Sequence, residues 1–172
     1  EAAATNWETT ASISCTAVTG APPLTTDNAN RTITGGLSTT NTAAACTITN
    51  TKRAHVTLAK SVGGRVNSSD QFTVSASGGG TLTGTTSATT ESTETSASTT
   101  FYSTPGTALT LTDAKSAGPT PLAEYDSRLT CSNAFSGPGA TASTSLPSNL
   151  GATSTSLTPA PGDDITCAFA NT

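Results

Sequence analysis

The sequence predicts an all-β fold made of tandem Greek-key β-sandwiches. Apolar residues stand at alternate positions in short runs, which is the period of a half-buried strand. Ser and Thr make up about a third of the chain and Met is absent, so strand-forming residues are common and strong helix formers are scarce. Clusters of Gly, Pro, Asn and Asp separate the runs, as expected for short strands joined by turns.

Alternation places six strands in the second part of the chain. Their approximate bounds are 55–62, 71–77, 108–113, 125–131, 154–158 and 165–171. Between the second and third of these, residues 83–100 are almost all Ser, Thr, Ala and Glu. Such a stretch has no clear apolar period, so we expect either a long loop or an exposed edge strand there.

Composition argues against several classes of function. Charged residues are 10% of the chain and the net charge is −4, whereas nucleic-acid binding needs patches of Lys and Arg. No run of about twenty apolar residues is present, so we expect no membrane-spanning helix. The single His and the absence of a CxxC motif argue against a metal site, a cofactor and enzymatic turnover.

The four cysteines belong to an internal repeat. The ending CTITNT at Cys46–Thr51 returns as CAFANT at Cys167–Thr172, and a further cysteine precedes each ending at a similar separation, Cys15 in the first copy and Cys131 in the second. We therefore expect the disulfides Cys15–Cys46 and Cys131–Cys167. Disulfides are typical of oxidising compartments, which predicts a secreted or cell-surface protein.

The two copies differ in how much sequence precedes the first cysteine. About 80 residues of strand-rich sequence come before Cys131 in its copy, and far fewer come before Cys15. We interpret residues 1–51 as the C-terminal half of one sandwich and residues 52–172 as a complete one. A half-sandwich leaves strand edges unpaired, so its missing strands would come either from upstream sequence or from a neighbouring subunit. The sequence leaves both sources open.

Three polar residues stand on strand faces that are otherwise apolar. Lys60 shares its face with Val and Leu in the first of the six strands, Asp113 shares its face with two Leu in the third, and Asn171 shares its face with Ile, Cys and Phe in the last. Burial of an unpaired ammonium or carboxylate costs several kcal/mol. Burial also lowers the pKa of a Lys and raises that of an Asp.

These residue types suggest an autocatalytic cross-link. An uncharged amine is a nucleophile, and a protonated acid can polarise an amide carbonyl. Attack of Lys60 on the side-chain carbonyl of Asn171 would expel ammonia, with Asp113 moving the protons, and the isopeptide bond would tie the first strand to the last. The simpler alternative is a strand-end lysine that reaches solvent, an aspartate that starts a turn and an asparagine that caps the last strand.

The segments that carry this pattern resemble the prealbumin-like, CnaB-type (Ig-like) repeat domains of bacterial surface proteins, pilins and adhesins. They are VTLAK at 56–60, FTV at 72–74, LTLTDA at 109–114, LTC at 129–131 and ITCAFANT at 165–172. The resemblance implies Lys60 as nucleophile, Asn171 as acceptor and Asp113 as catalytic acid. The family acid is more often Glu, which makes Glu124 a second candidate.

The resemblance extends to residues 1–51 as a C-terminal half, where Glu1 corresponds to Asp113 and Asn50 to Asn171. It implies a structural, non-enzymatic subunit or segment of a surface fibre, pilus or stalk, with intradomain cross-links. Its partners would be other copies of the chain or adjacent repeats in a filament. The alternative is an adhesin-type module that binds a host or surface ligand, for which 101–102 (Phe-Tyr) is the candidate contact patch.

Overall fold

The computed structural model describes residues 6–8, 11–17, 24–35 and 44–172 of the chain. It divides into two compact units, Glu1–Lys52 and Arg53–Thr172. Both units are built from strands, which confirms the all-β fold; within the described residues the only helical segments are the 3₁₀ turns η1 (Leu122–Glu124) and η2 (Ser143–Ser145). Across those same ranges no helix has the length and apolar character needed to cross a membrane.

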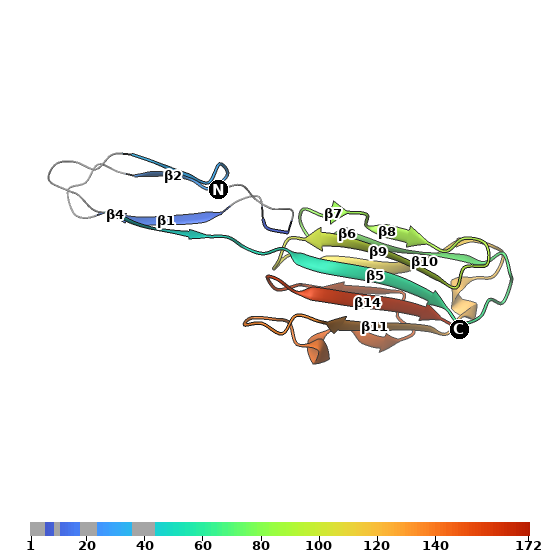
Figure 1. Cartoon of the computed structure of the whole chain (residues 1–172). Helices are drawn as coiled ribbons and strands as arrows, with labels where there is room; N and C mark the ends of the chain where they lie inside the picture. The colour runs from blue at the N-terminus through green and yellow to red at the C-terminus, as the bar shows by residue number, and fades with distance from the viewer. Residues whose placement is uncertain (1–5, 9–10, 18–23, 36–43) are drawn as a thin grey trace. The chain divides into compact units, whose positions relative to one another are not determined.

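The second unit is a sandwich of two sheets (Figure 1). The six-stranded sheet has the order β12 (Ser148–Leu150), β11 (Ser127–Asn133), β14 (Asp164–Asn171), β5 (Ala54–Val62), β9 (Ser96–Ser103) and β7 (Thr83–Gly84). The four-stranded sheet has the order β13 (Ser154–Leu157), β10 (Leu109–Ala117), β6 (Gln71–Gly78) and β8 (Ser87–Thr89). Stacked sheets of this kind bury the alternate, inward-facing residues of each strand.

The core between the sheets has two parts, and β5 contributes to both. Its inward residues Val56 and Leu58 belong to a large apolar cluster, and Val62 belongs to a smaller one with Phe72 and Tyr125. Full burial of such side chains contributes about 1.5–3 kcal/mol each. Between Leu58 and Val62, the inward position of β5 is occupied by a lysine, Lys60.

The first and last strands of the second unit are neighbours. β5 pairs in parallel with β14, with Lys60 opposite Phe169 and Val62 opposite Asn171. On its other edge β14 pairs antiparallel with β11, where Cys131 lies directly opposite Cys167 and forms a disulfide with it. The disulfide therefore joins two neighbouring strands of one sheet.

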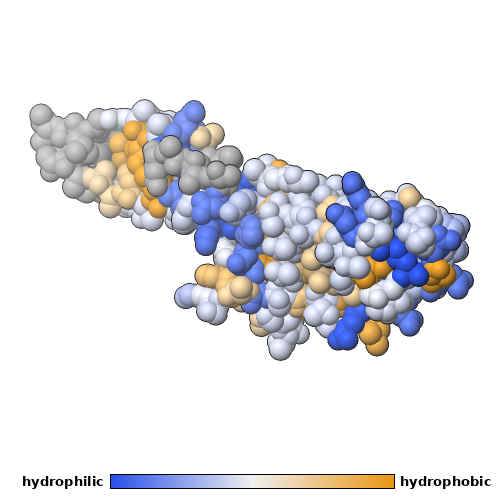
Figure 2. Space-filling view, turned by 45° about the vertical axis from the view of Figure 1, so that its right-hand side comes forward, coloured by the Kyte–Doolittle hydropathy of each residue, from blue (hydrophilic) through white to orange (hydrophobic). Residues whose placement is uncertain are grey.

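The segment 83–100 holds more regular structure than its composition indicates. It contains β7 and β8, which lie at the edges of the two sheets, and the beginning of β9. β9 is an interior strand between β5 and β7, and it buries Thr99 together with Phe101 and Ser103. Figure 2 shows that much of the surface of the second unit has intermediate hydropathy, in keeping with its many Ser and Thr residues.

The first unit contains two antiparallel strand pairs in its described part. β1 (Ser12–Ala17) pairs with β4 (Ala44–Thr49), and β2 (Thr25–Asp27) pairs with β3 (Thr32–Thr34). Cys15 lies opposite Cys46 and forms the second disulfide. The first unit thus repeats the disulfide-linked strand pair that β11 and β14 form in the second.

Candidate cross-linking site

Two sheets contribute to a polar group inside the second sandwich. Lys60 of β5 and Asn171 of β14 face inward from neighbouring parallel strands, and Asp113 of β10 faces them from the opposite sheet. Because Lys60 stands opposite Phe169, two positions before Asn171, Lys60 and Asn171 are diagonal neighbours on one face. The exposed fractions of the three residues are 1% for Lys60, 2% for Asp113 and 0% for Asn171.

The lysine and the aspartate are in direct contact. Nζ of Lys60 lies 2.8 Å from Oδ2 of Asp113 and 4.9 Å from the centre of the Phe72 ring. Burial lowers the pKa of Lys60 and raises the pKa of Asp113, and these effects exceed the opposing hydrogen bond and charge attraction between the two groups. Both shifts favour the uncharged amine and the protonated acid.

The carboxamide of Asn171 is polarised from one side. Its Oδ1 accepts a hydrogen bond of 3.0 Å from the hydroxyl of Ser127 on β11. Nδ2 of Asn171 and Oδ1 of Asp113 are both buried, and neither has a hydrogen bond of normal geometry within the described ranges. Burial raises the pKa of Asp113, and the carboxamide of Asn171 acts against burial in the same direction as Lys60, with the smaller effect of the two. A leaving nitrogen and a proton donor are therefore both available inside the site.

The other predicted site residues lie elsewhere. Glu124 is exposed at the end of η1, so Asp113 is the acid that contacts Lys60. Glu1 falls outside the residues that the structure describes. Asn50 is half-buried just after β4. Of the proposed adhesive pair, Phe101 is only 1% exposed and Tyr102 is half-buried against the ring of His55, which does not make an exposed aromatic patch.

Two residues of the site were not predicted from the sequence. Phe72 covers the amine of Lys60 from the opposite sheet, and the Ser127 hydroxyl donates a hydrogen bond to the carboxamide of Asn171. A signal for Ser127 exists, because it precedes Leu129 and Cys131 at the alternate positions of the inward face of β11. No comparable signal marks Phe72, since its contact with Lys60 depends on how the two sheets face each other.

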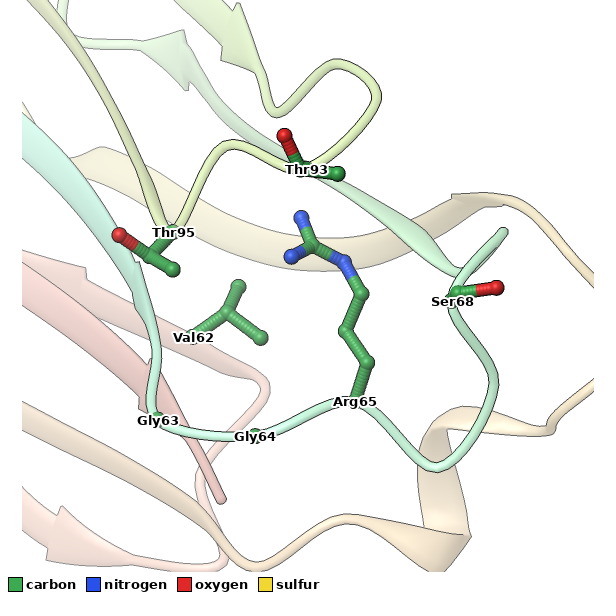
Figure 3. Close-up of a pocket in the computed structure, with 7 residues that line it drawn as sticks. All are labelled: Val62, Gly63, Gly64, Arg65, Ser68, Thr93 and Thr95. Carbon is green, nitrogen blue, oxygen red and sulfur yellow. The ribbon is translucent and has the colours of Figure 1, made fainter.

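A shallow pocket of about 260 Å³ lies beyond the end of β5 (Figure 3). It is lined by Val62, Gly63, Gly64, Arg65, Ser68, Thr93 and Thr95. The Arg65 guanidinium group donates to the backbone carbonyls of Asp70 and Glu94, so its charge is already engaged. None of Lys60, Asp113 and Asn171 lines this pocket. Among the described residues no cluster of His, Cys, Asp or Glu could hold a metal ion.

The fold and the site define an all-β sandwich domain with a buried Lys–Asp–Asn group between its first and last strands. The chain belongs to the family of prealbumin-like fold domains, whose family model matches residues 55–172. This membership confirms the resemblance inferred from the sequence. Among curated proteins none matches the chain.

Solved structures similar to the chain include two major pilin proteins of Streptococcus pyogenes. The T3.2 pilin is 10% identical with a TM-score of 0.40, and the match covers 72% of this chain and 46% of that one. The T-13 pilin is 14% identical with a TM-score of 0.39, and the match covers 73% of this chain and 48% of that one. The chain thus spans slightly less than half the length of either pilin.

Proposed function

We propose that the chain is a structural segment of a bacterial surface fibre, pilus or stalk, and that an isopeptide bond between Lys60 and Asn171 fastens its second unit. The observation that supports this most strongly is the buried contact between Lys60 and Asp113 beside Asn171, on adjacent first and last strands. The two disulfides favour an extracellular location. Membership of the prealbumin-like family fits the same role.

The reaction transfers an acyl group within the domain. The uncharged amine of Lys60 attacks Cγ of Asn171, and the hydroxyl of Ser127 stabilises the negative charge that develops on Oδ1. Asp113 donates its proton to Nδ2 and receives one from Nζ, so it ends as it began. The Cγ–Nδ2 bond breaks, ammonia leaves, and an amide joins Lys60 to Asn171.

The surroundings of the site suit this chemistry. The side chains of Lys60 and Asp113 are both inaccessible to solvent, and the Phe72 ring lies over the amine. Exclusion of water strengthens electrostatic interactions and protects a reactive group from competing reactions. The same burial favours the uncharged forms that the reaction needs. The product amide has no charge, so the reaction also removes the cost of holding an ammonium group in the core.

Intact mass spectrometry of the full chain tests the proposal. Under reducing conditions we expect a mass about 17 Da below that of the sequence, from the loss of one ammonia. The variants Lys60→Ala and Asn171→Ala should show their unmodified masses. The matched control Lys52→Ala, in a lysine outside the second unit, should keep the 17 Da deficit. A reduced wild-type chain with the mass of its sequence would refute the cross-link.

A further inference from the structure

We propose that the open edge of β4 in the first unit accepts a parallel β-strand with the residue pattern of β5, namely Val-x-Leu-x-Lys-x-Val. The acceptor edge is the side of β4 that faces away from β1. In the described part of the first unit, β4 belongs to a sheet of two strands and pairs with β1 alone. A separate bridge joins Trp7 to Lys52, beyond the end of β4. This inference concerns non-covalent pairing and does not depend on the proposed isopeptide bond.

The second unit supplies the template for this pairing. The ladder of β1 with β4 matches that of β11 with β14, because Cys15–Cys46 and Cys131–Cys167 occupy equivalent opposed positions. In the second unit the other edge of β14 carries β5 over the whole length of the strand, from Asp164 opposite His55 to Asn171 opposite Val62. The edge of β4 that corresponds to this β5 position is the acceptor edge.

Backbone groups on the acceptor edge point in the direction that pairing requires. The Cα atoms of Cys15 and Cys46 are 4.1 Å apart, which marks a non-hydrogen-bonded pair of an antiparallel ladder. Ile13, two residues earlier, accordingly donates its N–H to Oδ1 of Asn28 at 3.1 Å and not to β4. Its partner Ile48 must therefore direct its own N–H away from β1, toward the acceptor edge.

The exposure of the β4 side chains is consistent with an empty strand position beside the acceptor edge. In β14, Cys167 and Phe169 are 0% exposed, whereas all six residues of β4 are exposed and Ile48 reaches 42%. Figure 2 shows apolar surface on the first unit. An edge that combines open backbone groups with exposed apolar side chains is a template for strand addition. β4 carries no charged residue, which favours an apolar strand over a charged peptide.

The register of the second unit identifies the strand in more detail. Leu58 stands opposite Cys167, Lys60 opposite Phe169 and Val62 opposite Asn171. By equivalence, the incoming strand places a Leu opposite Cys46, a Lys opposite Ile48 and a Val opposite Asn50. The Lys then becomes the diagonal neighbour of Asn50, as Lys60 is of Asn171. The occupant that fits this register is the first strand of another sandwich repeat of the same family.

A synthetic peptide with the sequence of residues 54–62 tests the proposal against the full chain. We expect saturable binding with a Kd below about 1 mM, together with shifts of the β4 amide signals in the NMR spectrum. A control peptide with Ser at the positions of Val56, Leu58 and Val62 keeps the length and charge and should bind at least tenfold more weakly. Equal binding of the two peptides would overturn the proposed register.

Two variants of one residue separate edge pairing from other modes of binding. Ile48→Pro removes the N–H that faces the acceptor edge and should abolish binding, whereas Ile48→Val keeps that N–H and an apolar side chain and should bind normally. Absence of binding at 1 mM peptide, or shifts confined to the second unit, would refute the proposal. The 17 Da mass deficit is measured separately, so failure here leaves the proposed cross-link standing, and the reverse also holds.

Discussion

At the scale of single residues, the contact between Lys60 and Asp113 would lower the stability of the folded state as long as both groups are charged. Neither side chain reaches solvent, and desolvation of two charges offsets most of their mutual attraction. A proton transfer to the uncharged pair reduces this cost, and conversion of the amine to an amide removes it. Folding and cross-linking are then coupled, because the buried environment that disfavours the charges also creates the nucleophile.

Substitution of Asp113 distinguishes the two candidate acids. Asp113→Asn keeps the size of the side chain but cannot carry a proton between Nζ and Nδ2, so we expect cross-linking to slow by about 10²-fold or more. Glu124→Gln changes an exposed carboxylate and should leave the rate unchanged. A time course of intact mass after refolding measures both rates. Slow cross-linking in Glu124→Gln with a normal rate in Asp113→Asn would reverse the assignment.

Ser127 is expected to act directly in catalysis, because its hydroxyl donates a hydrogen bond to Oδ1 of Asn171, one of the reacting atoms. Loss of one donor to a developing oxyanion typically costs about 10²–10³ in rate, so Ser127→Ala should cross-link slowly but completely. Ser127→Thr retains a hydroxyl and should restore most of the rate. The same mass time course checks both variants. If Ser127→Ala reacts as fast as the wild type, the hydroxyl has only a structural role.

The sequence identified those site residues that stand on an otherwise apolar strand face. Lys60, Asp113 and Asn171 each interrupt such a face, so alternation alone singles them out. Phe72 looked like any other core residue, because its distance from the Lys60 amine depends on the contact between two sheets. The choice between Asp113 and Glu124 also required the structure, since only burial and distance distinguish them.

At the scale of the elements, Asp70 joins the connection between β5 and β6 to strand β10 and to the connection between β10 and β11. Its inaccessible carboxylate accepts hydrogen bonds from the hydroxyl of Tyr125 at 2.5 Å and from the backbone N–H of Thr120 at 3.2 Å, and it pairs with Lys115 at 2.9 Å. Burial alone would raise the pKa of Asp70, but these hydrogen bonds outweigh it and hold the pKa well below its usual value. The folded state therefore prefers the ionised form.

This preference predicts acid sensitivity of the second unit. A carboxyl group whose pKa is lower in the folded state stabilises the fold above its unfolded pKa, which is about 3.9, and the stabilisation disappears as the pH falls through the folded pKa. We expect the urea midpoint of Lys60→Ala, which lacks the cross-link, to fall between pH 5 and pH 2. Asp70→Asn in the same background should flatten this dependence. An unchanged slope would exclude Asp70 as its source.

The interior strand that the sequence did not predict, β9, was missed for a physical reason. Apolar alternation located β5, β6, β10, β11, β13 and β14 to within a few residues. β9 was missed as an interior strand because two of its buried positions are Thr99 and Ser103, which are polar by type although they face inward. In a chain so rich in Ser and Thr, hydropathy cannot distinguish the inward from the outward face of such a strand.

At the scale of the whole molecule, the parallel pairing of β5 and β14 determines how the second unit would respond to a pulling force. When the unit is pulled from its two ends, tension enters at the start of β5 and leaves at the end of β14, at opposite ends of the paired strands. The ladder between them is therefore loaded in shear, so that its hydrogen bonds share the load. A bond from Lys60 to Asn171 would carry the tension directly and remove almost all of the intervening chain from the loaded path.

Single-molecule extension of the full chain measures this consequence as length. In the wild type we expect no unfolding step from the second unit, because about 110 residues lie between the joined positions and cannot extend. In Lys60→Ala under oxidising conditions, the disulfide still shields the segment between its cysteines, which are 36 positions apart. About 75 residues are then released, and the contour gain is about 260 Å at about 3.5 Å per residue. A reductant should lengthen this step to about 390 Å.

The first unit is unchanged in this variant and serves as an internal control. A 260 Å step in the wild type would show that tension passes through the ladder and not through a covalent bond.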